Sequence, residues 1–251
     1  MRKKTKQQKD DLTVITLSQV SALSIEHHST GHKAVDALFG GKGLASGSVN
    51  LVAGPPGIGK STLLSYIADL FSELGKPVLY LTLEESLQQM KLRTDRLKIK
   101  GKKFHVSEDQ SCALIIKKAE HLKPAIIIVD SIQMLQSDVK KHSHAIDNSV
   151  HHIKEWAKHQ SIPLLLVGHY TKKGKIAGSN HMQHMVDAIY EISKSESSNE
   201  KIVKALKNRF GATDTELRYM ITDKGIDLFS EKVSFREAAH SNPFTEEDDD
   251  E

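Results

Sequence analysis

The sequence has 251 residues, of which 38% are hydrophobic and 27% charged, and its formal net charge is +3. This length and composition predict one globular α/β domain of about 200 residues with flanking arms. A single cysteine, Cys112, excludes an internal disulfide and a cysteine-rich zinc site. The longest apolar run, at 125–129, is too short to cross a bilayer, and the basic start lacks the apolar core of a secretory signal. We therefore expect a cytoplasmic protein without a membrane partner.

Charge is concentrated at the two ends. Residues 1–9 carry five cations, and residues 246–251 are all acidic. Such blocks are usually solvated, and they also often contact nucleic acid or compete with it, so both interpretations stay open. We predict a basic arm and linker at 1–24, a globular domain at 25–230 and a flexible acidic tail at 231–251. The fourteen histidines form adjacent pairs and scattered singles rather than a tetrahedral set, so we expect no structural metal.

Apolar runs and amphipathic segments alternate over the first 170 residues. The short apolar runs that predict buried strands are 48–54, 77–85, 123–130 and 162–169. The segments with helical spacing are 61–75, 86–97 and 150–159. This alternation is typical of a mostly parallel sheet covered by helices on both faces. After residue 186, three strand-like runs with polar turns between them suggest antiparallel strands added at the sheet edge: 187–193, 201–207 and 216–222.

Residues 54–62, GPPGIGKST, match the phosphate-loop pattern G-x-x-x-x-G-K-[ST] between an expected strand and helix. Glycines let the backbone approach phosphate oxygens, and the loop amides and helix N-terminus present positive charge. Lys60 would bridge the β- and γ-phosphates, Ser61 would ligate Mg²⁺, and Thr62 would lie towards the α-phosphate. With ATP and Mg²⁺ as cofactors, the expected nucleotide-binding residues are Gly54, Pro55, Pro56, Gly57, Ile58, Gly59, Lys60, Ser61, Thr62 and Asp130.

Acidic residues follow two of the expected strands. Asp130 would hold the water shell of Mg²⁺, with a helix N-cap as the alternative. Hydrolysis also needs a group that orients the attacking water, and Glu84 and Glu85 are the candidates. Neighbouring strand residues face opposite sides, so we expect one of them to face the γ-phosphate, Glu84 first and Glu85 as the alternative. His169 would either sense the γ-phosphate or serve as a satisfied polar strand end.

Seven stretches then occur in an order that is typical of one family. They are STGHKAVDALFGGKGLASGS (29–48), GPPGIGKSTLL (54–64), EESLQQMKLRTDRL (84–97), IIIVDSIQ (126–133), VGHYTKKGKIAG (167–178), HMVDAIYE (184–191) and KNRFGAT (207–213). From about Leu17 to about Phe229 the chain resembles the ATPase core of the bacterial RadA/Sms family, a RecA/DnaB-like branch, whose own signature is KNRFG. The four-cysteine zinc module and the Lon-like domain typical of that family are absent from this sequence, and Leu83 replaces the usual small residue before the glutamate pair.

The resemblance implies a RecA-like phosphate-loop fold and ATP hydrolysis coupled to single-stranded or branched DNA in recombination and repair. It also implies a homo-oligomeric ring or filament, with a recombinase or a single-strand-binding protein as further partners. Two polar segments, 137–149 and 170–181, are candidate DNA loops, and ordinary surface lysines are the alternative. Their candidate DNA-binding residues are Lys140, Lys141, Lys173 and Lys175.

The KNRFG segment supplies further cations. Lys207 and Arg209 are two positions apart, so on a strand they would project from one face, and Phe210 and Gly211 suit a hydrophobic anchor and a turn. By resemblance to RecA-like assemblies they would reach the γ-phosphate of a neighbouring subunit, where Lys172 could join them. Direct contact with the DNA backbone is the alternative for this pair.

Two rival functions remain at this level. A nucleotide-dependent regulatory or adaptor protein would keep the fold but turn over little ATP. A small-molecule kinase is disfavoured because the sequence lacks a lid-like arginine cluster and contains KNRFG.

Overall fold

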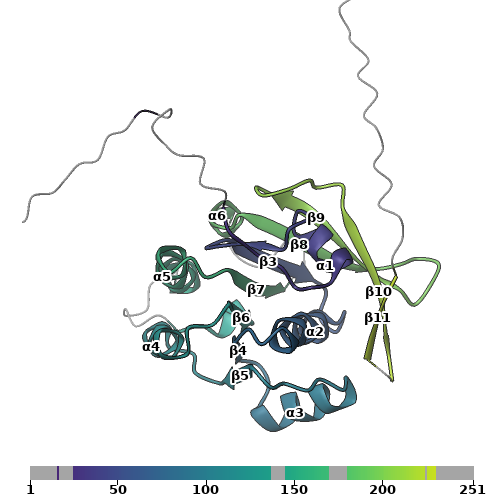
Figure 1. Ribbon diagram of the computed structural model, residues 1–251, viewed down its shortest axis with the longest axis horizontal. Helices are drawn as coiled ribbons and strands as arrows, with labels where there is room; N and C mark the ends of the chain where they lie inside the picture. Colours follow the sequence, from purple (N-terminus) through teal and green to yellow (C-terminus); the bar gives the residue numbers. More distant parts are fainter. Residues whose placement is uncertain (1–15, 17–24, 137–144, 170–179, 224, 230–251) are drawn as a thin grey trace, which may run out of the picture.

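The computed structural model describes residue 16 and residues 25–136, 145–169, 180–223 and 225–229 (Figure 1). Its centre is a nine-stranded sheet with the order β11-β10-β9-β8-β3-β7-β6-β4-β5. Six of these strands run parallel to one another: β3 (Val49–Gly54), β4 (Val78–Thr82), β5 (Phe104–Ser107), β6 (Ile126–Asp130), β7 (Leu164–His169) and β8 (Ala188–Lys194). This confirms the predicted α/β class with a mostly parallel sheet.

Helices cover both faces of the sheet. They are α1 (Lys33–Leu38), α2 (Lys60–Glu73), α3 (Leu87–Arg96), α4 (Cys112–Leu122), α5 (Ala145–His159) and α6 (Asn180–Met185), with a short 3₁₀ turn, η2 (Ile132–Met134). Apolar side chains of α1, α2 and α3 pack in one core cluster, and those of α4, α5 and α6 in a second. The strand β6 joins both clusters because alternate residues face opposite sides: Ile126 and Ile128 enter the first, Ile127 and Val129 the second. Such two-sided burial explains why the first four residues of β6 are all apolar.

The sheet continues beyond its parallel part through β9 (Lys201–Asn208), β10 (Glu216–Thr222) and β11 (Gly225–Phe229), which are antiparallel to their neighbours. The first of the three late runs needs a correction, because β8 pairs parallel with β3 and only its other edge is antiparallel, to β9. The turn between β8 and β9 is closed by the Ser195 amide, which donates to the Glu200 carbonyl at 2.9 Å, as its composition predicts. A separate small pair, β1 (His27–His28) and β2 (Leu44–Ala45), lies before the main sheet.

The hairpin of β10 and β11 extends from the sheet towards the side of the molecule that carries α3 (Figure 1). A Cβ added at Gly225 would lie 3.3 Å from the carbonyl oxygen of Leu97, directly after α3. The start of β11 therefore lies against the end of α3. No helix within the described ranges has the length and apolar character that crossing a bilayer requires.

Candidate active site

The phosphate-loop segment joins β3 to α2 at the carboxyl ends of the parallel strands, which we call the carboxyl edge of the sheet. Gly57 and Gly59 have φ values of +72° and +107°, in the left-handed region that favours glycine. Gly54 is required for a different reason, because an added Cβ would lie 2.7 Å from the carbonyl oxygen of Ile192 on β8. The first amides of α2 have no partner within the helix and open towards this loop, which suits an anion.

The Lys60 side chain folds back over the loop. It is only 4% exposed, and its Nζ donates to the carbonyl oxygens of Gly54 at 2.9 Å and Pro55 at 3.0 Å. Burial lowers the pKa of Lys60, while the nearby carboxylates of Asp130 and Glu84 act in the opposite direction. The ammonium group thus lies between the loop and two acidic side chains, where phosphate oxygens would compete with the carbonyls for it.

A hydrogen-bonded chain connects Asp130 to the start of α2. The hydroxyl of Tyr80 on β4 donates to Asp130 Oδ2 at 2.6 Å, and both side chains are buried. Ser65, beside the Tyr80 hydroxyl, donates to the carbonyl oxygen of Ser61 at 2.8 Å. Burial and the Asp130 carboxylate raise the pKa of Tyr80 well above its ordinary value, so Tyr80 stays a donor at neutral pH. Tyr80 therefore fixes the carboxylate that faces the phosphate-loop helix.

The two adjacent glutamates have different surroundings. Glu84 accepts a hydrogen bond from Ser131 and contacts His169 Nε2 at 2.8 Å, both at the carboxyl edge of the sheet. Burial alone would raise the pKa of Glu84, but the hydrogen bonds from Ser131 and His169 outweigh it and lower this pKa. The Glu85 carboxylate lies instead 2.5 Å from Nη1 of Arg93. Burial raises the pKa of Glu85, which Arg93 opposes and the Asp130 carboxylate reinforces.

Arg93 is a residue of this cluster that the sequence did not single out. Its side chain is 12% exposed, and its Nε and Nη2 are buried without a hydrogen-bond partner among the described residues. The local reason for its position is the start of α3, where Ser86 and Gln89 form a reciprocal capping box directly after the glutamates. Two helical turns later Arg93 returns to Glu85. The two residues of this contact are eight positions apart in the sequence. Nothing in the sequence distinguishes Arg93 from the six other cations within 91–103.

The KNRFG segment lies at the amino ends of the parallel strands, which we call the amino edge of the sheet, and so on the side opposite the phosphate loop. Asn208 pairs with Ala188, which pairs in turn with Asn50 near the start of β3. Gly54 lies four positions after Asn50 on this strand, about 13 Å away, so neither cation reaches the phosphate loop of its own chain. Only Lys207 lies on a strand, because β9 ends at Asn208 and Arg209 follows in a turn. The expectation that both project from one strand face is therefore wrong for Arg209.

Both cations make hydrogen bonds to groups of their own chain. Lys207 Nζ donates to the carbonyl oxygens of Gln183 at 2.9 Å and Val186 at 2.7 Å, at the end of α6. Arg209 Nη1 donates to Asp187 Oδ1 at 3.1 Å, while the other carboxylate oxygen of Asp187 accepts from the Val49 amide at 3.0 Å. These contacts fix both cations relative to the sheet.

The expected turn after Arg209 packs on an early glycine loop. Phe210 is half-buried, and a Cβ added at Gly211 would lie 2.4 Å from the Cα of Gly40. The remaining candidates lie outside the described residues; they are Lys140, Lys141, Lys172, Lys173 and Lys175.

Comparison with known proteins extends these observations. Residues 16–175 match a family model described as an AAA domain. The chain belongs to the AAA domain family. Proteins named DNA repair protein RadA are similar over most of this AAA-domain chain, which confirms the resemblance inferred from its motifs.

Three of these relatives show the extent of the similarity. The RadA of Aquifex aeolicus is 37% identical over 214 residues, which cover 84% of this chain and 48% of the relative. The RadA of Pseudomonas aeruginosa is 36% identical over 216 residues, 84% of this chain and 47% of the relative. The RadA of Bacillus subtilis is 37% identical over 194 residues, 74% of this chain and 42% of the relative. The chain thus spans about half the length of the relatives it matches.

Proposed function

We propose that the chain binds ATP with Mg²⁺ and hydrolyses it, and that hydrolysis is coupled to single-stranded or branched DNA in repair and recombination. The observation that carries this proposal is the convergence of Lys60, Asp130 and Glu84 at the carboxyl edge of neighbouring parallel strands. Ligands of open parallel sheets bind at that edge. The similarity to DNA repair proteins named RadA supports the choice of DNA as partner.

The residues present suit a magnesium nucleotide. Lys60 has three donors and only two carbonyl partners, both on the loop that would receive the phosphates. Ser61 in the first turn of α2 and Asp130 opposite it would hold Mg²⁺ directly and through water, with Thr62 beside them. When bound, the ion neutralises charge on the phosphate oxygens. The remaining loop residues, Gly54 to Gly59, would surround the phosphates, with backbone amides as donors except at Pro55 and Pro56.

Glu84 is the proposed base that orients the attacking water. Its carboxylate is near Lys60, and its lowered pKa keeps it ionised at neutral pH. Glu85 is assigned a supporting role because Arg93 occupies its carboxylate. Lys207 and Arg209, joined by Lys172, would act on the γ-phosphate of a neighbouring subunit, so a ring or filament is part of this proposal.

The DNA contacts are proposed to be Lys140, Lys141, Lys173 and Lys175, with a cytoplasmic location and a recombinase or single-strand-binding protein as an additional partner. An ATPase of this kind should be stimulated by single-stranded DNA. Turnover that stays negligible with and without DNA would instead favour the adaptor function.

The decisive experiment compares Glu84→Gln with Glu85→Gln. With single-stranded DNA present, Glu84→Gln should lower kcat by about 10²–10⁴-fold, because it removes the base, and leave the Kd for ATP nearly unchanged. Glu85→Gln should lower kcat less than Glu84→Gln, because it weakens only the contact with Arg93 and keeps the base. Equal losses in the two variants, or full turnover by Glu84→Gln, would contradict the assignment.

A further inference from the structure

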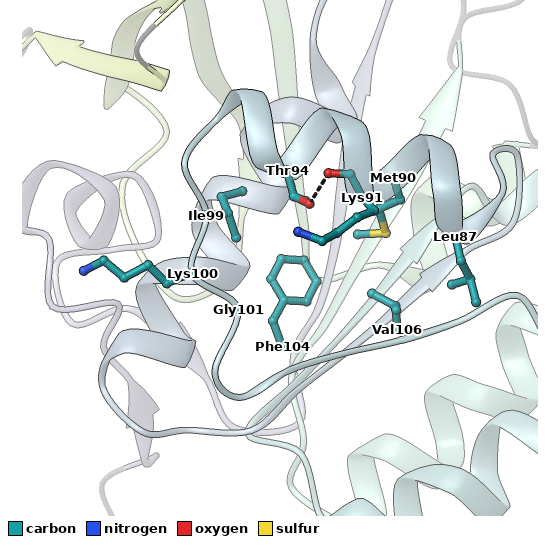
Figure 2. Close-up of a pocket in the computed structure, with 9 residues that line it drawn as sticks. All are labelled: Leu87, Met90, Lys91, Thr94, Ile99, Lys100, Gly101, Phe104 and Val106. Atoms are coloured by element: carbon teal, nitrogen blue, oxygen red, sulfur yellow. Dashed lines mark hydrogen bonds between the residues drawn. The ribbon is translucent and has the colours of Figure 1, made fainter.

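An apolar cavity lies between α3 and the edge strand β5, away from the candidate active site. It has a volume of about 200 Å³ and opens to solvent between the helix and the strand (Figure 2). The apolar side chains that line this α3–β5 groove are Leu87, Met90, Ile99, Phe104 and Val106. Leu87 is 38% and Val106 42% exposed, so the groove presents apolar surface to solvent. An exposed apolar groove of this kind is a candidate docking site.

The surface around the groove is strongly basic. Residues 91–103 contain seven cations and one acidic residue. Six of these cations are exposed: Lys91, Arg96, Lys98, Lys100, Lys102 and Lys103. Two of them form surface ion pairs, Lys91 with Asp95 and Lys100 with Glu73. Such exposed pairs contribute little to the free energy of folding. Lys98, Lys102 and Lys103 have no ion pair within the described ranges.

The complement of this surface is a peptide with one apolar side chain and several carboxylates. The chain contains such a peptide outside the described residues. Residues 242–251 read NPFTEEDDDE, in which Phe244 is followed by six consecutive acidic residues at 246–251. We propose that residues 242–251 dock in the α3–β5 groove of their own chain, with the Phe244 ring in the cavity and the carboxylates on the lysines. Aromatic burial and charge complementarity act together in this contact.

The geometry of β11 places this segment within reach. Gly225, where β11 begins, lies against the Leu97 carbonyl, two residues before the groove residue Ile99. Phe229 lies four residues further along the strand, about 14 Å away. The fourteen residues between Phe229 and Phe244 span about 20 Å on average as a flexible chain and at most about 50 Å.

Tethering strengthens this contact. A flexible linker of this length holds the segment at an effective concentration on the order of millimolar, so a weak contact suffices to keep the groove filled. The contact does not depend on ATP hydrolysis. It bears on the candidate site all the same, because α3 begins two residues after Glu85 and carries Arg93.

The test uses the full-length chain with the photoreactive residue p-benzoylphenylalanine at position 244. Equal amounts of isotopically light and heavy chains are mixed, irradiated and mapped by mass spectrometry. The expected cross-links join position 244 to residues 87–106 of the same isotope. Raising the salt from about 0.05 to about 0.5 M should lower their yield, since screening weakens the lysine–carboxylate attraction. Mixed-isotope cross-links, cross-links to another surface, or none at all would overturn the proposal.

A pair of surface variants controls for the specificity of the contact. Val106→Asp, in the cross-linking chain, places a carboxylate in the groove and should lower the yield at least about fivefold. Leu114→Asp alters an exposed leucine on α4 (48% exposed) and should leave the yield unchanged. Equal effects of the two variants would overturn the groove as the docking site.

A nucleic acid is the competing occupant of this basic surface. Lys100→Glu combined with Lys102→Glu should release the tail cross-link without weakening the binding of a single-stranded oligonucleotide. Weakened oligonucleotide binding together with an unchanged cross-link would identify the surface as a nucleic-acid site and overturn the proposal.

Discussion

The two edges of the parallel sheet carry cations of different character. At the carboxyl edge, Lys60 is buried on the carbonyl oxygens of its own loop. At the same edge, His169 Nδ1 and two nitrogens of Arg93 are buried without partners among the described residues. At the amino edge, Lys207 and Arg209 have partners in their own chain, and the Arg209 side chain is 58% exposed.

This difference indicates what each edge can bind. Buried polar groups that lack partners are costly, so a cluster of them suits a ligand that completes their hydrogen bonds. An exposed arginine such as Arg209, which contacts Asp187 at 3.1 Å, suits a surface that another molecule approaches. The comparison therefore supports the proposals that the nucleotide binds at the carboxyl edge and that a neighbouring subunit contacts the amino edge. Three experiments test the two assignments, in order of expected effect.

The largest effect is expected from separating the two edges in different subunits. Lys60→Ala should abolish ATP turnover without unfolding the chain, and Arg209→Ala should lower it by about 10³-fold or more, as expected for a missing finger cation. When the two variants are mixed and co-assemble, interfaces that pair an intact phosphate loop with an intact KNRFG segment should recover part of the activity. The measurement is ATPase rate against mixing ratio, with the mass of the assembly in solution.

The contrary outcome is equally definite. If the mixture remains as inactive as either parent although the two variants co-assemble, KNRFG does not act on the neighbour. A salt-dependent loss of DNA affinity in Arg209→Ala would then identify it as a contact to the DNA backbone. A control variant, Arg218→Ala, changes an arginine on β10 that contacts Glu216 at 2.8 Å and should behave as the unmodified chain.

The phosphate loop and the parallel strands could be predicted because their signals are local. A buried strand such as β6 is apolar up to its final aspartate, and the loop follows a fixed spacing between a strand and a helix. The strand β5 and the helix α4 were missed. Two of the four residues of β5 are exposed, so it lacks the pattern of a buried strand, and it lies at the sheet edge.

Long-range pairing was not predictable from the sequence. The same alternation in 187–193 suits a parallel or an antiparallel neighbour, and only the assembled sheet pairs β8 parallel to β3. Strand alternation predicted that one of Glu84 and Glu85 faces the γ-phosphate, but β4 ends at Thr82 and both glutamates lie in the bend that follows, so this premise was wrong. Their partners were not predicted either. Ser131, His169 and Arg93 come from three different elements, and no spacing in the sequence connects them.

A medium effect is expected at the carboxyl edge from Arg93→Met. The variant removes the cation that holds Glu85, so the turn that carries Glu84 loses its fixed position. We expect kcat to fall by about 10–100-fold, with a smaller change in the Kd for ATP, because misplacement by about 1 Å costs rate more than binding. Arg96→Met, at an exposed arginine of the same helix, is the matched control and should retain full turnover.

Stability measurements separate positioning from simple destabilisation. Arg93→Met leaves the Glu85 carboxylate without its cation, which should lower the free energy of unfolding by up to about 3–5 kcal/mol. Adding Glu85→Gln removes that unpaired charge and should restore most of the stability while kcat stays low. Recovery of kcat together with stability in the double variant would show that Arg93 only supports the fold.

The smallest expected effect is a shift in the pH profile at Glu84. The hydrogen bonds from Ser131 and His169 lower the pKa of this glutamate, so a base at this position stays ionised as the pH falls below the ordinary glutamate range. In the unmodified chain the acid limb of the kcat–pH profile should therefore lie below that range.

His169→Ala removes one hydrogen bond to Glu84, which should raise the pKa of Glu84 and move the acid limb to higher pH. His169→Gln keeps a nitrogen donor and should move it less. If both variants lose activity equally at every pH, His169 acts on something other than the Glu84 carboxylate, and the proton acceptor must be sought elsewhere at the carboxyl edge.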